Sequence, residues 1–139
     1  MSRAVIRRIL ECSLREFSTA HGLDVAAENR VFAPKRTPYL ETSLMISDEG
    51  AAALGADAPE KSVGILQVTI VTAANESAHV ADELAGALKD HFGRRRLRED
   101  GASIVITRVR SVKGVSSAKT YTLPVSVEFR ADTDFNPAR

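Results

Sequence analysis

The sequence is short of cysteine, tryptophan and long apolar runs, and each shortage excludes a class of protein. The single cysteine, Cys12, has no partner for a disulfide within the chain, so a scaffold held by internal disulfides is excluded. No apolar run approaches the ~20 residues that cross a bilayer, and the first residues lack the apolar stretch of a secretory signal. These features predict a protein that is made and kept in a cytoplasm and does not enter a membrane.

The sequence also lacks an excess of charge of either sign. It has 19 Lys and Arg residues against 18 Asp and Glu residues, which gives a formal net charge of +1. Such a chain has no overall field to attract nucleic acid or an anionic membrane. Aromatic residues make up only 5% of the chain, so there are few platforms on which unpaired bases could stack. A polyanionic partner would therefore need a local basic patch.

What the chain does contain is enough apolar sequence for one core, since 44% of its 139 residues are hydrophobic. Period-3.6 patterns predict two helices and period-2 patterns predict about five strands. The predicted helices are Ser2–Ala20 and the segment from the cap Asn75 to Phe92, and the predicted strands are Leu23–Glu28, Tyr39–Ile46, Val63–Val71, Ser103–Arg110 and Thr120–Arg130.

The order helix-strand-strand-strand-helix-strand-strand does not alternate regularly enough for a doubly wound sheet. It predicts an α+β fold, with a mostly antiparallel sheet of about five strands and both helices packed on one face. We expect one domain over residues 1–131, followed by a polar tail at 132–139.

The predicted strand Val63–Val71 is apolar on both faces. Leu66, Val68 and Ile70 lie on one face, and Val63, Ile65 and Val71 lie on the other. Two helices can cover only one face of the sheet, so the second set needs neighbouring structure. This pattern predicts self-association.

No group of residues in the sequence indicates catalysis or a cofactor. His79 and His91 lie about 18 Å apart along one predicted helix at ~1.5 Å per residue, so they cannot share a metal ion within one chain. Cys12 falls at the margin of an apolar helical stripe, which favours a small packed residue over a nucleophile. No glycine-rich phosphate loop is present. We expect no catalytic residue, metal, cofactor or small-molecule substrate.

The turn Arg94–Arg98 is the most suggestive local feature, because clustered guanidinium groups can bind phosphates or acidic protein surfaces. It can equally be a solvated turn that complements a helix C-terminus. The connection Asn29–Pro38 has Phe32 as its one large anchor. The loop Ser47–Ser62 is longer than a hairpin needs, and is either a surface excursion or a segment that orders on a partner.

Several short segments of the sequence together form a familiar pattern. They are Glu28 and Asn29, Phe32, Pro34, Pro38 to Leu40, the strand Gly64 to Val68, the pair His91 and Phe92, and the strand Leu123 to Arg130. This pattern resembles that of one family, the small bacteriophage tail-terminator-like proteins. The resemblance runs from about Ile6 to Ala131, and it does not include the Ser47–Ser62 loop.

The resemblance implies a structural protein of a long-tailed phage or prophage, without enzyme activity. Such a protein caps the growing tail tube as a hexameric ring, stops polymerisation and presents a surface for head joining. The implied partners are other copies of the chain, the tail-tube protein and the head-tail joining protein. The implied location is the host bacterial cytoplasm during assembly and then the virion tail.

The family pattern assigns no individual contact residues, so those predicted here come from the sequence alone. The candidate assembly contacts are Phe32, Lys35, Arg36, Tyr39, Arg94, Arg95 and Arg96. One alternative is a small nucleic-acid-binding or adaptor-binding module that uses the Arg94–Arg98 turn. A third class, a small enzyme whose site a partner completes, predicts a deep pocket with converging titratable groups.

Overall fold

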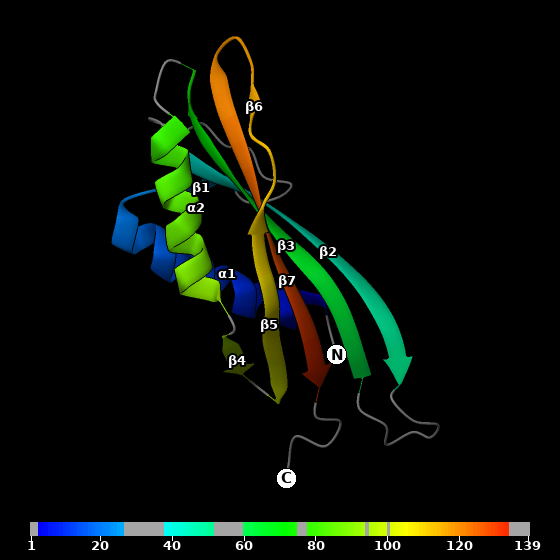
Figure 1. Cartoon of the computed structure of the whole chain (residues 1–139). Coiled ribbons are helices and arrows are strands. Elements are labelled where there is room, and N and C mark those ends of the chain that lie inside the picture. Colours follow the sequence, from blue (N-terminus) through cyan, green and yellow to red (C-terminus); the bar gives the residue numbers. More distant parts are fainter. Residues whose placement is uncertain are drawn as a thin grey trace.

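The computed structural model describes residues 3–26, 38–51, 60–74, 78–93, 95–99 and 101–133 (Figure 1). Its elements are α1 (Arg3–His21), β1 (Asp24–Ala26), β2 (Tyr39–Ala51), β3 (Glu60–Ala73), α2 (Ala78–Phe92), β4 (Arg96–Glu99), β5 (Ala102–Ser111), β6 (Val115–Ser116) and β7 (Thr120–Thr133). Neither of these two helices has the length and hydropathy to span a bilayer within the part of the chain described.

The strands form one seven-stranded sheet in the order β1-β2-β3-β7-β5-β4, with β6 paired to β7 outside this path. The α+β class is confirmed. The prediction of a mostly antiparallel sheet of about five strands is wrong, because the sheet is mixed and has two further strands. β1 pairs with β2 in parallel, which requires a crossover between them rather than a tight hairpin. The order along the chain also differs, since β4 and β6 interrupt the predicted sequence of elements.

α1 forms where the sequence repeats apolar residues at helical spacing, and it ends at a glycine. Gly22 has a φ of 66°, a left-handed conformation that glycine adopts without steric cost. Gly22 N donates to Thr19 O at 3.3 Å, and Leu23 N donates to Ser18 O at 2.9 Å. These two bonds satisfy the last free carbonyls of the helix as in a Schellman motif. Gly22 therefore ends the helix.

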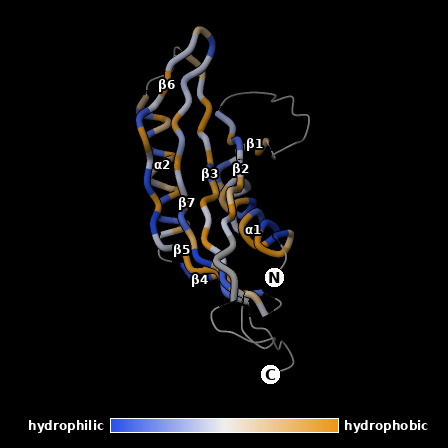
Figure 2. The backbone as a smooth tube through the Cα atoms, turned by 90° about the vertical axis from the view of Figure 1, so that its right-hand side faces the viewer, coloured by the Kyte–Doolittle hydropathy of each residue, from blue (hydrophilic) through white to orange (hydrophobic). Residues whose placement is uncertain are grey.

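One face of the sheet, here called the inner face, packs against both helices. Hydrophobic and hydrophilic residues alternate around α1 and α2 (Figure 2), and the hydrophobic sides join the core. On the sheet, every second residue of the long strands is buried. The buried inner-face residues are Leu40 and Leu44 of β2, Leu66, Val68 and Ile70 of β3, and Leu123, Val125, Val127 and Phe129 of β7.

A bulge in β5 changes which of its residues reach the core. The pairing of β5 with β7 shifts between Ile106 and Arg108, so Thr107 is the extra residue. Thr107 Oγ1 donates to Glu128 O at 3.2 Å. Val109 therefore lies on the inner face with Ile106, although plain alternation from the sequence placed it on the opposite face. The other face of the sheet, here called the outer face, has no helix among the described residues.

β7 continues through Asp132 and Thr133, two residues beyond the predicted domain boundary. β3 and β7 pair along thirteen successive residue pairs and form the centre of the sheet. These two strands extend from the part of the sheet that lies over α1 to the far end, where β6 and β7 form a projecting hairpin (Figure 1). Any contact surface on this molecule is therefore distributed along an elongated sheet.

Candidate functional site

Four of the seven predicted contact residues, Phe32, Lys35, Arg36 and Arg94, lie outside the described residues. The other three are not brought together. Tyr39 begins β2, whereas Arg95 and Arg96 lie at β4, on the opposite edge of the sheet. Four strand spacings of ~4.8 Å separate β2 from β4, about 19 Å in all. These residues cannot form one compact site within a single copy.

Tyr39 lies opposite Val71 and is half-buried. Burial raises the pKa of its phenol above the ordinary value of 10.0, and the nearby Glu41 carboxylate raises it further through its charge and by accepting a hydrogen bond. The phenol therefore stays protonated at neutral pH. Its one O–H donates to Glu41, so a partner at this edge of the sheet would meet a neutral phenol oxygen that can accept a hydrogen bond.

Arg95 helps to connect α2 to the sheet through its backbone. Its N–H donates to Phe92 O at 3.1 Å, and its carbonyl accepts from Ile106 N at 2.8 Å. The guanidinium groups of Arg95, Arg96 and Arg98 are on exposed residues. These arginines remain available for an external partner, but their own strand is short and lies at the sheet edge.

His91 joins the two helices. Its Nε2 lies 2.8 Å from Ser13 O, and because a carbonyl only accepts, this bond places a hydrogen on Nε2. The Arg95 guanidinium, 3.5 Å from the same nitrogen, is then a neighbour rather than a donor to it. The hydrogen-bond partner of His91 is therefore on α1. Its role in the structure is packing and orientation.

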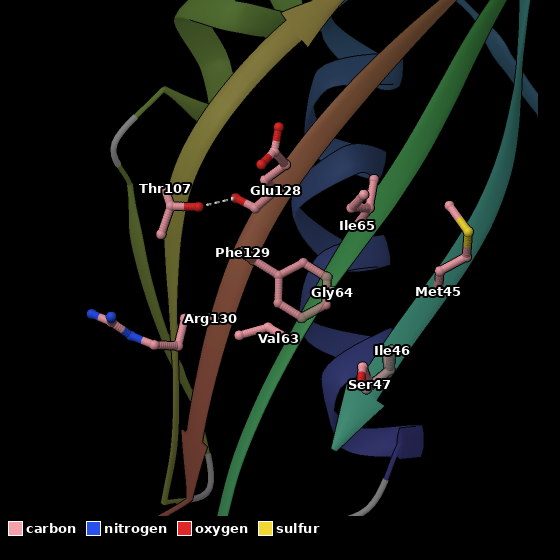
Figure 3. A pocket seen from close by; sticks show the side chains of 10 residues that line it. All are labelled: Met45, Ile46, Ser47, Val63, Gly64, Ile65, Thr107, Glu128, Phe129 and Arg130. Carbon is pink, nitrogen blue, oxygen red and sulfur yellow. Dashed lines mark hydrogen bonds between the residues drawn. The ribbon is translucent and has the colours of Figure 1, made fainter. Parts of the chain in front are cut away.

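A hollow of about 490 Å³ opens at one end of the outer face. Figure 3 shows Met45 from β2, Val63 and Ile65 from β3, and Glu128 and Arg130 from β7 around it, with α1 behind the sheet. Met45 is 50% exposed. This hollow, together with its lining, is the most apolar part of the uncovered face.

Glu128, at the rim of this hollow, has one carboxylate oxygen that is both paired with an arginine and buried. Arg110 Nε lies 3.4 Å from Glu128 Oε2. That oxygen is nevertheless buried and receives no hydrogen bond from the described residues. The ion pair therefore neutralises part of the charge but does not supply a well-directed donor.

The hairpin Val112–Lys119, which contains β6, projects from the other end of the sheet (Figure 1). Val112 is 46% and Val115 is 60% exposed. Ser117 fixes the turn, because its N–H donates to Thr120 O at 2.8 Å. In the sequence this segment is marked only by two valines in a Ser- and Gly-rich stretch.

Both edges of the sheet carry strand segments that have no neighbouring strand among the described residues. β1 pairs only with Tyr39–Glu41, so residues 42–51 of β2 extend beyond it. β4 pairs only with residues 102–105, so residues 107–111 of β5 extend beyond it. Arg3 Nη2 donates to Leu44 O at 3.0 Å and covers one point of the β2 edge. Such edges can pair with another chain.

The described residues contain no group of three or more His, Cys, Asp or Glu residues placed to hold a metal ion. Cys12, predicted as a packed residue, is exposed. α1 presents it to solvent because it lies just beyond the buried stripe that includes Ser13 and Leu14. The site-forming features of this molecule are therefore surfaces: the hollow, the hairpin and the two sheet edges.

Two comparisons with known proteins found matches, one to a family and one to solved structures. A family model described as "Phage tail terminator protein" matches residues 5–129. Among solved structures, eight chains match; one of them is 22% identical, covers 99% of this chain and 99% of its own length, and superposes with a TM-score of 0.77. At that identity the similarity shows the shared fold. No curated protein matches the chain.

Proposed function

The chain belongs to the phage tail terminator family, and from that premise we propose that it caps the tail tube, ends tube polymerisation and provides the surface for head joining. The resemblance noted in the sequence is thereby confirmed. Family membership supports a structural role in a phage tail and makes other tail and head proteins its expected partners. The capping function, the ring and the individual partners are our proposals.

The observation that supports assembly is the outer face, which has no helix among the described residues, together with the segments of β2 and β5 that extend beyond β1 and β4 at the two sides of the sheet. A ring requires that one surface of each copy bind a different surface of the next copy, with a rotation that closes. The β2 and β5 edges lie on opposite sides of the sheet and can meet edges of neighbouring copies. We propose a ring of six copies, the number that the family resemblance implied.

Termination follows if the two faces of the ring differ. One ring face would bind the end of the tail tube, and the other would lack the surface to which another tube subunit adds. The same second face would be available to the head-joining protein. In this proposal the protein is assembled in the host cytoplasm, becomes part of the virion tail and carries out no reaction.

The first experiment measures the mass of the purified protein, alone and with purified tail-tube protein. We expect a ring, or a monomer that converts to a ring on tube ends. The functional arm is a phage lacking this protein, which should produce tails of uncontrolled length. Complementation with the wild-type chain should restore uniform tails. Uniform tails in its absence would contradict the proposal.

A second function, nucleic-acid or adaptor binding through the Arg94–Arg98 turn, rests on one observation, the exposure of Arg95, Arg96 and Arg98. It predicts binding to DNA that weakens steeply as salt is raised. The near-neutral net charge opposes strong binding of this kind. A salt titration of DNA binding distinguishes this function from tube capping.

A further inference from the structure

We propose that the tip of the Val112–Lys119 hairpin of one copy docks in the outer-face hollow of a second copy. This inference rests on the proposed self-assembly and names the surfaces that carry it. The hairpin is the donor surface. The hollow lined by Met45, Val63, Ile65 and Glu128 is the acceptor surface.

The first argument is the distribution of exposed apolar side chains. Met45, Val112 and Val115 are the large hydrophobic residues that stand exposed among the described residues. Two of them lie on the hairpin and the third lies at the hollow. A single exposed apolar residue needs no explanation, but docking these two surfaces would remove all three from water in one contact.

The second argument excludes the molecule's own hairpin as the occupant. Val115 pairs with Thr122 at the start of β7, whereas the hollow lies beside Phe129. The seven steps along the chain from Thr122 to Phe129 span about 23 Å at ~3.3 Å per residue. A hairpin that continues the sheet outward cannot fold back over that distance, so a hairpin in the hollow would have to come from another copy.

The third argument is charge. The hairpin carries Lys113 and Lys119 and no acidic residue. The hollow offers the Glu128 carboxylate, whose side chain is 30% exposed and is paired with Arg110 through the buried Oε2. An ammonium group from the neighbouring copy would approach the exposed part of this carboxylate. Arg130 also lines the hollow, but it is exposed, and its long side chain can turn its charge to solvent.

The fourth argument is symmetry. Because the donor and acceptor surfaces are different, the contact is heterologous and each copy can bind one copy ahead and one behind. The hairpin projects from one end of the elongated sheet (Figure 1), and the residues that line the hollow lie toward the other end of β7, so docking can pass from copy to copy. The contact therefore propagates and closes into a ring when the rotation between copies permits it.

The test uses paired cysteines in a Cys12→Ser background. One preparation carries Met45→Cys and a second, distinguishable by a tag, carries Val115→Cys. After mixing, a short bis-maleimide should join M45C to V115C copies. The matched control is Ser116→Cys, because Ser116 is adjacent to Val115 and points to the opposite face of the hairpin. We expect at least a tenfold lower yield with S116C.

A charge reversal provides a second measurement. Glu128→Lys and Lys113→Glu should each weaken assembly about tenfold, and mixing E128K copies with K113E copies should restore part of the loss at that one contact. If cross-linked M45C and V115C copies form closed assemblies, both the docking and the ring are supported. If they form only a reciprocal dimer, the docking is supported and the ring is contradicted.

Assemblies of wild-type mass without the M45C–V115C product would overturn the docking and leave the ring intact. Attachment of V115C to the tail-tube protein instead of to another copy would also overturn it. A wild-type protein that stays monomeric with and without tail tubes would contradict both proposals. Circular dichroism and unfolding of each variant, compared with the parent, identify any variant that fails to fold.

Discussion

At the scale of single residues, Gly64 allows β2 and the aromatic ring of Phe129 to approach β3 closely. A Cβ at this position would lie 2.4 Å from Met45 O and 2.6 Å from a Phe129 ring carbon. The ring could shift, but the carbonyl belongs to the paired backbone of β2. The absence of a side chain at Gly64 therefore permits the packing of Phe129 in the core.

Gly64→Ala should lower the free energy of unfolding by about 1–3 kcal/mol, because the added methyl group forces the backbone or Phe129 to move. Denaturant unfolding measures the change. The matched control is Gly86→Ala on the exposed side of α2, where a Cβ would meet nothing within 4 Å. That variant should gain about 0.5–1 kcal/mol from helix propensity. Equal stability of the two variants would contradict this account of Gly64.

The His91 side chain is the polar link between α1 and α2. His91→Ala removes the bond from Nε2 to Ser13 O and the ring contacts with Phe17, whose ring centre lies 5.5 Å away. We expect a loss of about 1–3 kcal/mol in thermal or denaturant unfolding. His79→Ala is the control, since the His79 side chain is 74% exposed and pairs with Glu83 on the same helix. It should change stability by less than about 0.5 kcal/mol.

Tyr39 makes stability depend on pH in the alkaline range. Its folded-state pKa is raised above 10.0, so the native state holds the proton more tightly than the unfolded state. The resulting stability is fully present below pH 10.0 and is lost as pH rises through the raised pKa. Tyr39→Phe should flatten this part of the curve of unfolding free energy against pH. An unchanged alkaline slope in Y39F would contradict the assignment.

At the scale of elements, the sequence was informative where one period persists. α1, α2 and the central strands were predicted because their apolar residues repeat regularly, and Gly22 was identified from its position after the last turn. β4 was missed because Arg96–Glu99 holds one apolar residue, Leu97, among charged ones. The bulge at Thr107 was missed because a simple period of two cannot include an extra residue. The parallel pairing of β1 depends on a crossover that local pattern does not specify.

The candidate site was harder to predict than the fold. Met45 was placed on the second face of its strand, and it does line the hollow there. Val112 and Val115 were missed, because two short apolar side chains in a polar loop resemble ordinary loop composition. Their importance depends on where the hairpin projects, which only the assembled sheet determines.

β4 provides an element-scale prediction about what holds it in place. Leu97 packs against the core, whereas Arg96 and Arg98 are exposed. Leu97→Ala should therefore cost about 1–2 kcal/mol, while Arg96→Ala and Arg98→Ala should each change stability by less than about 0.5 kcal/mol. The pair between Arg8 Nη2 and Glu99 Oε1, at 3.2 Å and half-exposed, adds little. Chemical denaturation of the three variants measures the order of effects.

At the scale of the whole molecule, the uncovered face is less uniformly apolar than the sequence suggested. Val63 and Ile65 are half-buried beside the hollow, but Gln67, Thr69 and Ser126 occupy the middle of the same face. Gln67 Nε2 donates to Thr69 Oγ1 at 3.4 Å, but self-association over the entire face would take the remaining polar atoms of these side chains out of water. A local contact at the hollow, combined with the strand edges, fits the distribution of polarity better than sheet-on-sheet packing.

The Arg94–Arg98 turn is predicted to contact the tube end or the head-joining protein and to contribute little to folding. Arg95 and Arg96 are exposed, and the backbone bonds of Arg95 do not need its side chain. Replacing Arg94, Arg95 and Arg96 by Ala should leave unfolding and ring mass unchanged but lower the yield of infectious particles at least tenfold, because the ring would bind the tube end or the head-joining protein less well. Arg108→Ala, which removes one exposed arginine from β5, is the control for loss of positive charge elsewhere on the surface. Normal tail length and infectivity in the triple variant would remove the turn from the assembly surface, while leaving the hairpin contact between copies to be judged by its own cross-link.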